Sequence, residues 1–208
     1  MGSQREFKES AAEASGLCGE GKKALVLMGS PRHEGATAKL VQCFIEQWKA
    51  SVNPRDGVVV IEAYKAAVKP CIHCGYCKQT PDCRYDDDFK IIDRALKEAD
   101  FLVIASPVYG LGFPAPLKAI LDRTQQYFEA KFSLGIHKPI EKHKPALFLA
   151  AFGSSDPRGV KMMQDALKLT CLLMNAGLEH TIVAAHTDRV PVNLETVRGM
   201  MKQVLRGI

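Results

Sequence analysis

Residues 24–40 read ALVLMGSPRHEGATAKL, a short apolar run followed by a loop and the start of a helical pattern. An apolar run without polar alternation is typical of a strand that is buried on both faces of a parallel sheet. The same pattern returns four times along the chain. The further runs are VVVIEA (58–63), FLVIAS (101–106), ALFLAAF (146–152) and TIVAA (181–185).

Amphipathic segments with helical spacing separate these runs and follow the last one. One segment is expected to take Asp156 as its N-cap, with Pro157 at the first helical position, and to end at Gly177. The strict alternation predicts an α/β fold, a doubly wound parallel sheet with right-handed crossovers. For five strands the expected order is 2-1-3-4-5, the flavodoxin-like arrangement. The helical segments are 40–48, 89–99, 117–121, 156–177 and 193–205.

Composition sets the class of protein. At 208 residues, with 47% apolar and 25% charged residues, the chain suits a soluble globular domain. We expect one domain over residues 23–208, preceded by a polar, disordered extension over residues 1–22 that lacks a secretory signal. The net charge of +5 is scattered, and the apolar runs are too short to span a bilayer, so neither nucleic acid nor membrane is an expected partner. Seven cysteines without an export signal predict a reducing compartment, the cytoplasm.

One long segment, residues 125–144, fits none of these elements and is predicted to be irregular. It places Tyr127, Phe128 and Phe132 among charged residues. We expect it to pack on another subunit and to help close the binding site.

The first loop is a candidate anion site. In a doubly wound sheet, ligands bind outside the carboxyl ends of the strands. The loop GSPRHEGATAKL (29–40) precedes a helix start, where free N–H groups and the helix dipole favour negative charge. Ser30 and Thr37 supply hydroxyls, Gly35 admits a close approach, and Arg32 suits phosphate. Because the loop lacks G-x-G-x-x-G and a phosphate-binding lysine, a phosphate monoester fits best. A capped helix with an exposed arginine is the alternative.

Two further loops at the same edge suit a flat ring. In residues 106–123, glycines and prolines stiffen a turn that presents Val108 and Tyr109, although Tyr109 also fits a half-buried packing role. The loop after the fourth strand adds Gly153 beside another helix start. One loop for phosphate and two for a planar body together indicate a mononucleotide such as FMN.

Four cysteines form a separate motif. Cys71, Cys74, Cys77 and Cys83 have the spacing C-x2-C-x2-C-x5-C. Three cysteines at three-residue intervals with a fourth nearby suit iron–sulfur ligation. Zinc, with His73 as a further candidate, and a dithiol switch between Cys74 and Cys77 remain alternatives.

The surroundings of this motif add two expectations. The cysteine loop follows the second strand, so we expect it beside the first strand, at the edge of the sheet where the flavin is expected. We also expect that only ligation by the four cysteines brings the two ends of this loop together. The acidic run 86–88 is interpreted as a helix N-terminus, and the pair Asp122–Arg123 is interpreted as structural or interfacial. Cys18, Cys43 and Cys171 are assigned to the tail or the core.

Taken together, these segments resemble the flavodoxin-like NADPH-dependent FMN reductases, and most closely their iron–sulfur flavoprotein branch. The resemblance covers roughly residues 23–177 and implies FMN binding, a 4Fe–4S cluster on the four cysteines, and a homodimer or homotetramer. It implies that the phosphate is held by Ser30, Arg32, Gly35, Ala36 and Thr37, and that the ring is lined by Pro107, Val108, Tyr109, Gly110 and Gly153.

The expected function is therefore that of an FMN-dependent oxidoreductase. It would take electrons from NAD(P)H or a reduced redox protein and pass them to a small molecule or a protein acceptor. No side chain is required as a general acid or base, so no catalytic residue is assigned. The alternatives are a non-enzymatic flavodoxin-like shuttle and a zinc-clipped binding module.

Overall fold

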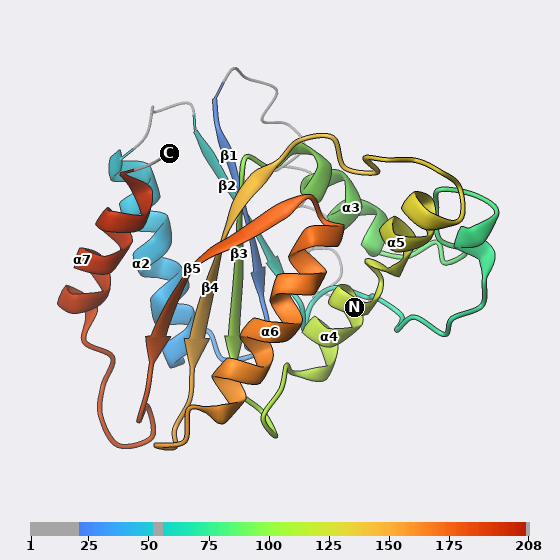
Figure 1. The fold of residues 1–208 in the computed structure, drawn as a ribbon. Coiled ribbons are helices and arrows are strands. Elements are labelled where there is room, and N and C mark those ends of the chain that lie inside the picture. The colour runs from blue at the N-terminus through green and yellow to red at the C-terminus, as the bar shows by residue number, and fades with distance from the viewer. Residues whose placement is uncertain (1–20, 52–55, 207–208) are drawn as a thin grey trace.

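The computed structural model describes residues 21–51 and 56–206, which form one five-stranded parallel sheet with helices on both faces (Figure 1). The strand order is β2-β1-β3-β4-β5, so the predicted flavodoxin-like order is confirmed. The predicted disordered extension, with Cys18, lies almost entirely outside the described residues. The strands are β1 (Lys23–Met28), β2 (Gly57–Glu62), β3 (Phe101–Pro107), β4 (Lys144–Ala151) and β5 (Ala176–Ala184).

The helices form two layers. Figure 1 shows α2 and α7 on one face of the sheet, with α3, α4 and α6 on the other. No helix within the described ranges is long and apolar enough to cross a membrane. The helices are α2 (Ala36–Ser51), α3 (Phe89–Glu98), α4 (Ala115–Asp122), α5 (Gln125–Phe132), α6 (Arg158–Leu173), α7 (Leu194–Leu205) and the short 3-10 helix η1 (Tyr76–Lys78).

Burial on both faces explains the continuous apolar runs. In β1, Leu25 and Leu27 face the layer of α3, α4 and α6, whereas Ala24 and Val26 face the layer of α2 and α7. Successive side chains of a strand point to opposite faces, so the buried positions 24–28 of this strand all need apolar residues. All five strands run toward the same edge, the lower one in Figure 1, where the loops after β1, β3 and β4 emerge.

The predicted limits of α6 are wrong at both ends. The helix begins at Arg158 with Pro157 as its N-cap, and the Asp156 carboxylate accepts a hydrogen bond from the Arg158 backbone N–H at 2.9 Å. It ends at Leu173 because Asn175 takes a positive φ of 50° and turns the chain directly into β5. Gly177 therefore lies inside β5 rather than at the end of the helix.

The segment 125–144 is not irregular throughout, which corrects the prediction. Its first part is α5, and Tyr127 and Ile140 are buried in the core on the α6 side of the sheet. Phe128 and Phe132 remain on the surface, where their ring centroids lie 4.6 Å apart. The amphipathic character of α5 is weak, because it buries polar Gln126 as well as Tyr127.

Candidate functional site

The loop between β1 and α2 forms a tight cradle at the carboxyl edge. The Ser30 hydroxyl is buried and accepts a hydrogen bond from the Arg32 backbone N–H at 3.2 Å, while the Gly35 N–H donates to the Arg32 carbonyl at 3.2 Å. The helix starts at Ala36, and Thr37 is buried in its first turn. The first N–H groups of a helix lack partners within it and carry positive partial charge. The cradle therefore presents free donors beside two hydroxyls.

The charge of the cradle favours an anion. The first turn of α2 carries no acidic residue, and the Arg32 side chain is exposed at the mouth of the loop. A solvated guanidinium is free to pair with a phosphate, for which its planar donors are suited. All five predicted phosphate residues lie in this one turn, at positions 30, 32, 35, 36 and 37.

The loop after β3 is a two-residue hairpin. Tyr109 and Gly112 exchange backbone hydrogen bonds of 3.0 and 2.9 Å, and both Gly110 and Leu111 have positive φ, 55° and 65°. These values match the type I′ turn, in which glycine adopts a positive φ without strain and leucine does not. The turn leaves the Tyr109 ring 45% exposed at the edge of the sheet. Sequence reasoning missed the strained Leu111, because no local pattern marks it.

Hydrogen bonds between the neighbouring strand ends bring the three loops together. The Gly29 N–H donates to the Ala105 carbonyl at 2.8 Å, and the Val108 N–H donates to the Ala151 carbonyl at 3.0 Å. These two bonds tie the loop after β1 to the end of β3, and the loop after β3 to the end of β4. The predicted ring-lining residues 107–110 and Gly153 thus lie at adjacent strand ends, next to the loop between β1 and α2.

Two close approaches at this edge were not foreseen. A Cβ atom on Gly153 would stand 1.7 Å from the Asp188 carboxylate oxygen, so a larger residue there requires the exposed Asp188 side chain to move. A Cβ atom on Gly159, in the first turn of α6, would stand 2.5 Å from a methyl group of Val108. Both contacts join segments that are distant in sequence, and a single sequence carries no signal for them.

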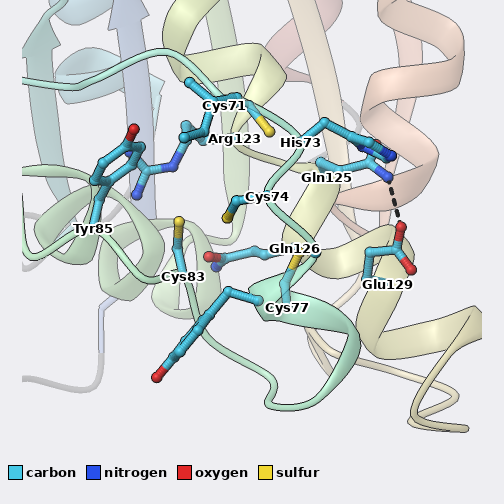
Figure 2. A pocket seen from close by; sticks show the side chains of 13 residues that line it. Cys71, His73, Cys74, Cys77, Cys83, Tyr85, Arg123, Gln125, Gln126 and Glu129 are labelled. Atoms are coloured by element: carbon cyan, nitrogen blue, oxygen red, sulfur yellow. Dashed lines mark hydrogen bonds between the residues drawn. The ribbon is translucent and has the colours of Figure 1, made fainter.

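The four cysteines line one pocket away from this edge. Figure 2 shows their side chains around a common space, and Figure 1 shows the loop projecting beside α5, which corrects the expectation that it lies on the flavin edge beside β1. Cys74 is exposed, the other three are partly buried, and all four are free thiols. The remaining lining residues are Ile72, His73, Gly75, Tyr76, Tyr85, Arg123, Gln125, Gln126 and Glu129.

The thiols differ in their electrostatic surroundings. A hydrogen bond from the Tyr76 backbone N–H lowers the pKa of Cys74, and a side-chain hydrogen bond from Arg84 lowers it further. Burial raises the pKa of Cys77, and the nearby thiols of Cys71 and Cys83 act in the same direction. These three thiols line the same pocket.

The four cysteines supply the donor type and the number of ligands that a 4Fe–4S cluster requires. Across residues 21–51 and 56–206, no three or more His, Cys, Asp or Glu side chains are arranged to hold one metal ion. A zinc ion needs four ligands at about 2.3 Å, with the sulfur atoms close to one another. A cubane cluster instead binds each thiolate to a different iron atom, so its cysteines stand further apart. Four free thiols line this one pocket, and four thiolates are the ligand number of a 4Fe–4S cluster.

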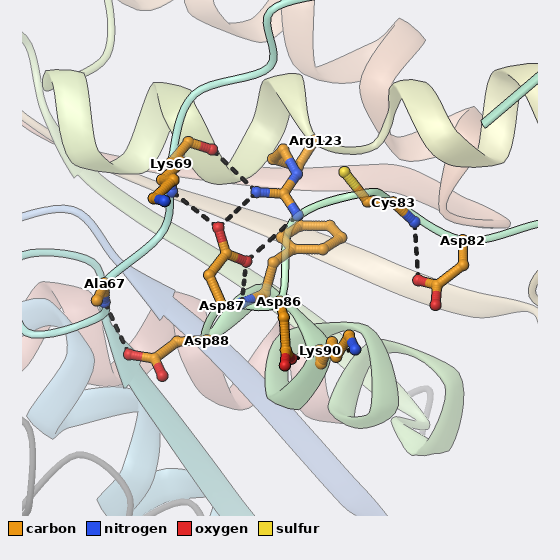
Figure 3. Close-up of polar contacts among 10 residues, drawn as sticks. Ala67, Lys69, Asp82, Cys83, Asp86, Asp87, Asp88, Lys90 and Arg123 are labelled. Atoms are coloured by element: carbon orange, nitrogen blue, oxygen red, sulfur yellow. Dashed lines mark hydrogen bonds and ion pairs between the residues drawn. The ribbon is translucent and has the colours of Figure 1, made fainter. Parts of the chain in front are cut away.

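Arg123, at the end of α4, closes the base of the cysteine loop (Figure 3). Its Nη1 donates to the Lys69 carbonyl at 3.0 Å and to the Asp87 carboxylate at 2.8 Å, and its Nη2 donates to the same carboxylate at 3.2 Å. Lys69 precedes the cysteines and Asp87 follows them. The expectation that ligation alone closes the loop is therefore wrong.

The acidic run serves the same closure. Asp88 is the N-cap residue of α3, at the predicted helix N-terminus, and its carboxylate accepts a hydrogen bond from the Ala67 N–H at 2.8 Å. Asp87 additionally accepts one from the Phe89 N–H at 3.1 Å. The structural interpretation of residues 86–88 and of Arg123 is thus consistent with these contacts.

The parallel sheet in the order 2-1-3-4-5, with helices on both faces, defines a flavodoxin-like fold. The sequence model of the NADPH-dependent FMN reductase family matches residues 22–186. The chain belongs to that family.

Two of the relatives are iron–sulfur flavoproteins, the branch of the family that the sequence resembles. An iron–sulfur flavoprotein of Methanocaldococcus jannaschii is 36% identical over 50% of this chain and 52% of its own, so the match spans about half the length of that relative. One from Methanosarcina thermophila is 30% identical over 67% of this chain and 68% of its own. An FMN-dependent NADH-azoreductase of Bacillus anthracis, solved with FMN, shares the fold with a TM-score of 0.66 and 15% identity, covering 89% of this chain and 99% of its own.

Proposed function

We propose that this protein is an FMN-dependent oxidoreductase that takes electrons from NAD(P)H or a reduced carrier and passes them to a small acceptor or a redox partner. The observation that carries the proposal is the cradle at the start of α2, where buried Ser30 and Thr37 and exposed Arg32 surround the free N–H groups. Membership of the NADPH-dependent FMN reductase family supports the same assignment.

The cradle and the hairpin have separate tasks in this proposal. The cradle binds the FMN phosphate through residues 30, 32, 35, 36 and 37, using backbone donors, hydroxyls and one guanidinium. The hairpin orients the ring and excludes water from one side of it, through Pro107, Val108, Tyr109 and Gly110, with Gly153 beside them. When bound, FMN accepts a hydride from a reduced nicotinamide and returns electrons singly or in pairs.

The cysteine pocket is the second redox site of the proposal. Cys71, Cys74, Cys77 and Cys83 hold a 4Fe–4S cluster, which supplies one-electron transfer when bound. Four free thiols around one pocket support this assignment, and so do the names of the two iron–sulfur flavoproteins.

The assembly is proposed to be a homodimer or a homotetramer. Phe128 and Phe132 are 39% and 64% exposed on α5, and their paired rings form an apolar patch of the kind that subunits cover. The patch lies in the segment that sequence reasoning assigned to a subunit contact.

Anaerobic purification followed by a visible spectrum and an iron assay tests the proposal. We expect flavin bands together with broad iron–sulfur absorption, and bleaching of the flavin bands when NADH or NADPH is added. Addition of a quinone should restore them. Bleaching by dithionite but by neither nicotinamide would favour an electron shuttle. A protein that binds zinc and no flavin would contradict the proposal outright.

A further inference from the structure

Arg123 has donors that the closure of the loop does not use. A guanidinium carries five N–H donors in a fixed plane. Two on Nη1 and one on Nη2 are taken by the Lys69 carbonyl and the Asp87 carboxylate. The Nε–H and the second Nη2–H remain, and they lie along one edge of the plane. Nε itself is buried and has no hydrogen-bond partner among the described residues.

The orientation of this free edge is fixed. The guanidinium carbon lies 5.3 Å from the ring centroid of Tyr85 and 4.8 Å from that of Phe89, and the fork on Asp87 sets the rotation within the plane. The side chain of Arg123 is only 1% exposed. A buried donor without a partner is rare in folded proteins and calls for a specific explanation.

The pocket that Arg123 lines is the cysteine pocket. Figures 2 and 3, drawn from different directions, both place the Cys83 sulfur beside the guanidinium of Arg123. Gln126 offers the other unsatisfied buried atom there, its Oε1, because its amide nitrogen donates to Asp93 at 3.1 Å. Arg123 Nε and Gln126 Oε1 do not pair with each other, since each lacks a partner in the described part of the chain.

We propose that the free edge of Arg123 donates a hydrogen bond to the sulfur of the cysteine-bound group, with Cys83 as the acceptor. The inference rests on the proposed cluster, because a thiolate sulfur is a much better acceptor than a thiol. Arg123 is then a positioning residue with two connected tasks. It holds both ends of the cysteine loop, and it places one buried donor and one positive charge against the sulfur.

This arrangement has a measurable consequence. Hydrogen bonds to the sulfur atoms and the local net charge are among the features that set the reduction potential of an iron–sulfur cluster. A donor stabilises the more negative, reduced form and therefore raises the potential. Arg123→Lys retains the positive charge but has no planar edge and no Nε–H. This substitution therefore separates the effect of the hydrogen bond on the reduction potential from the effect of the positive charge.

The test compares cluster potentials after anaerobic reconstitution with Fe²⁺ and sulfide. We expect the Arg123→Lys cluster to be reduced at a more negative midpoint potential than the wild-type cluster, while bound FMN is unchanged. Arg84→Lys is the matched control, because Arg84 is exposed and interacts with Cys74 instead. Its shift should be smaller. A wild-type midpoint in Arg123→Lys, or a shift no larger than that of Arg84→Lys, would overturn the inference.

A second measurement does not depend on the folding of the Arg123 variant. In an Arg84→Lys background, Arg123 is the one arginine among the described residues that line the pocket. Pulsed electron paramagnetic resonance of the reduced cluster, in protein labelled with ¹⁵N-arginine, should show a nitrogen coupling. A loaded cluster without that coupling refutes the donor and leaves the proposed function intact. A wild-type protein that takes up no iron refutes the cluster itself, and the inference with it.

Discussion

The proposed flavin edge, formed by the loops after β1, β3 and β4, and the cysteine pocket are built by different means. Backbone atoms dominate the flavin edge, with a helix start at Ala36, a hairpin at 109–112 and a glycine at 153, all at the ends of buried strands. Side chains dominate the cysteine pocket, which lies outside the sheet and is closed by the pair Arg123–Asp87. Folding of the sheet therefore forms the first site directly. The second site needs specific side chains in addition to the fold.

The two sites should also respond independently to substitutions. The cradle is bonded to the ends of β3 and α2, whereas the cysteine loop is bonded to α4 and α3 through Arg123, Asp87 and Asp88. Since the two sets of contacts share no hydrogen bond among those described, we expect each site to fail independently. The predictions below test this independence.

The largest effect is expected in the cysteine pocket. Cys77→Ser removes one of the four proposed ligands, so iron and acid-labile sulfide should be lost together after anaerobic reconstitution. FMN should remain bound, because the cradle is formed by other elements. The measurement is iron, sulfide and FMN per chain.

Cys43→Ala is the matched control for this prediction, since Cys43 is a buried thiol of α2 outside the pocket. It should change neither cofactor. If Cys77→Ser keeps its iron, the assignment of ligands fails. If it loses FMN as well, the two sites are coupled and the comparison above is wrong.

The next effect concerns the cradle. Arg32→Ala combined with Thr37→Ala removes contacts to the phosphate that are each worth roughly 1.5–3 kcal/mol, before non-additivity is considered. FMN affinity in a calorimetric titration should fall by about a hundredfold or more, with unchanged circular dichroism and iron content. Lys39→Ala, an exposed charge on the same helix, should leave the affinity close to that of the wild type. Unchanged FMN affinity in the double variant would show that this loop does not bind the FMN phosphate.

The contrast between a site built from backbone atoms and a site built from side chains also explains what the sequence could predict. The strands were found because each is buried on both faces and therefore reads as a continuous apolar run. The loop between β1 and α2 was predicted as a phosphate site because it carries its own chemistry, as in Ser30 and Thr37, and its binding of phosphate stays a prediction. Local sequence thus sufficed for the strands and for the position of the loop after β1, but not for the positive φ of Leu111 in the hairpin after β3.

The parts that sequence did not predict depend on contacts between distant segments. Helix α5 has a weak pattern because it buries Gln126 and Glu129, polar residues whose partners are the Asp93 side chain and the side chains of Gln125 and Ser133. Arg123 joins Lys69 to Asp87 across a long loop, and neither residue marks the other in the sequence. Such pairings become visible only when the chain is folded.

The smallest effect sharpens the comparison within the flavin edge itself. Gly159 lies in the first turn of α6, and a Cβ atom there would stand 2.5 Å from a Val108 methyl group and 3.2 Å from the Leu111 Cα. Gly159→Ala should gain about 1 kcal/mol of helix propensity but lose roughly 1–3 kcal/mol by overpacking. The hairpin has to move to relieve the contact, so FMN affinity should fall by a few-fold to about tenfold while the iron content stays the same.

Gly199→Ala in α7 isolates the effect of helix propensity. No described atom lies within 4 Å of a Cβ atom at that exposed position, so this variant should gain about 1 kcal/mol and raise Tm by roughly 2–4 °C. Gly159→Ala should lack that gain, because the same added methyl group meets the hairpin. Thermal unfolding and FMN titration of the two variants measure the difference. Equal stabilisation of both, with wild-type FMN affinity, would show that the hairpin tolerates movement and that its geometry does not set flavin binding.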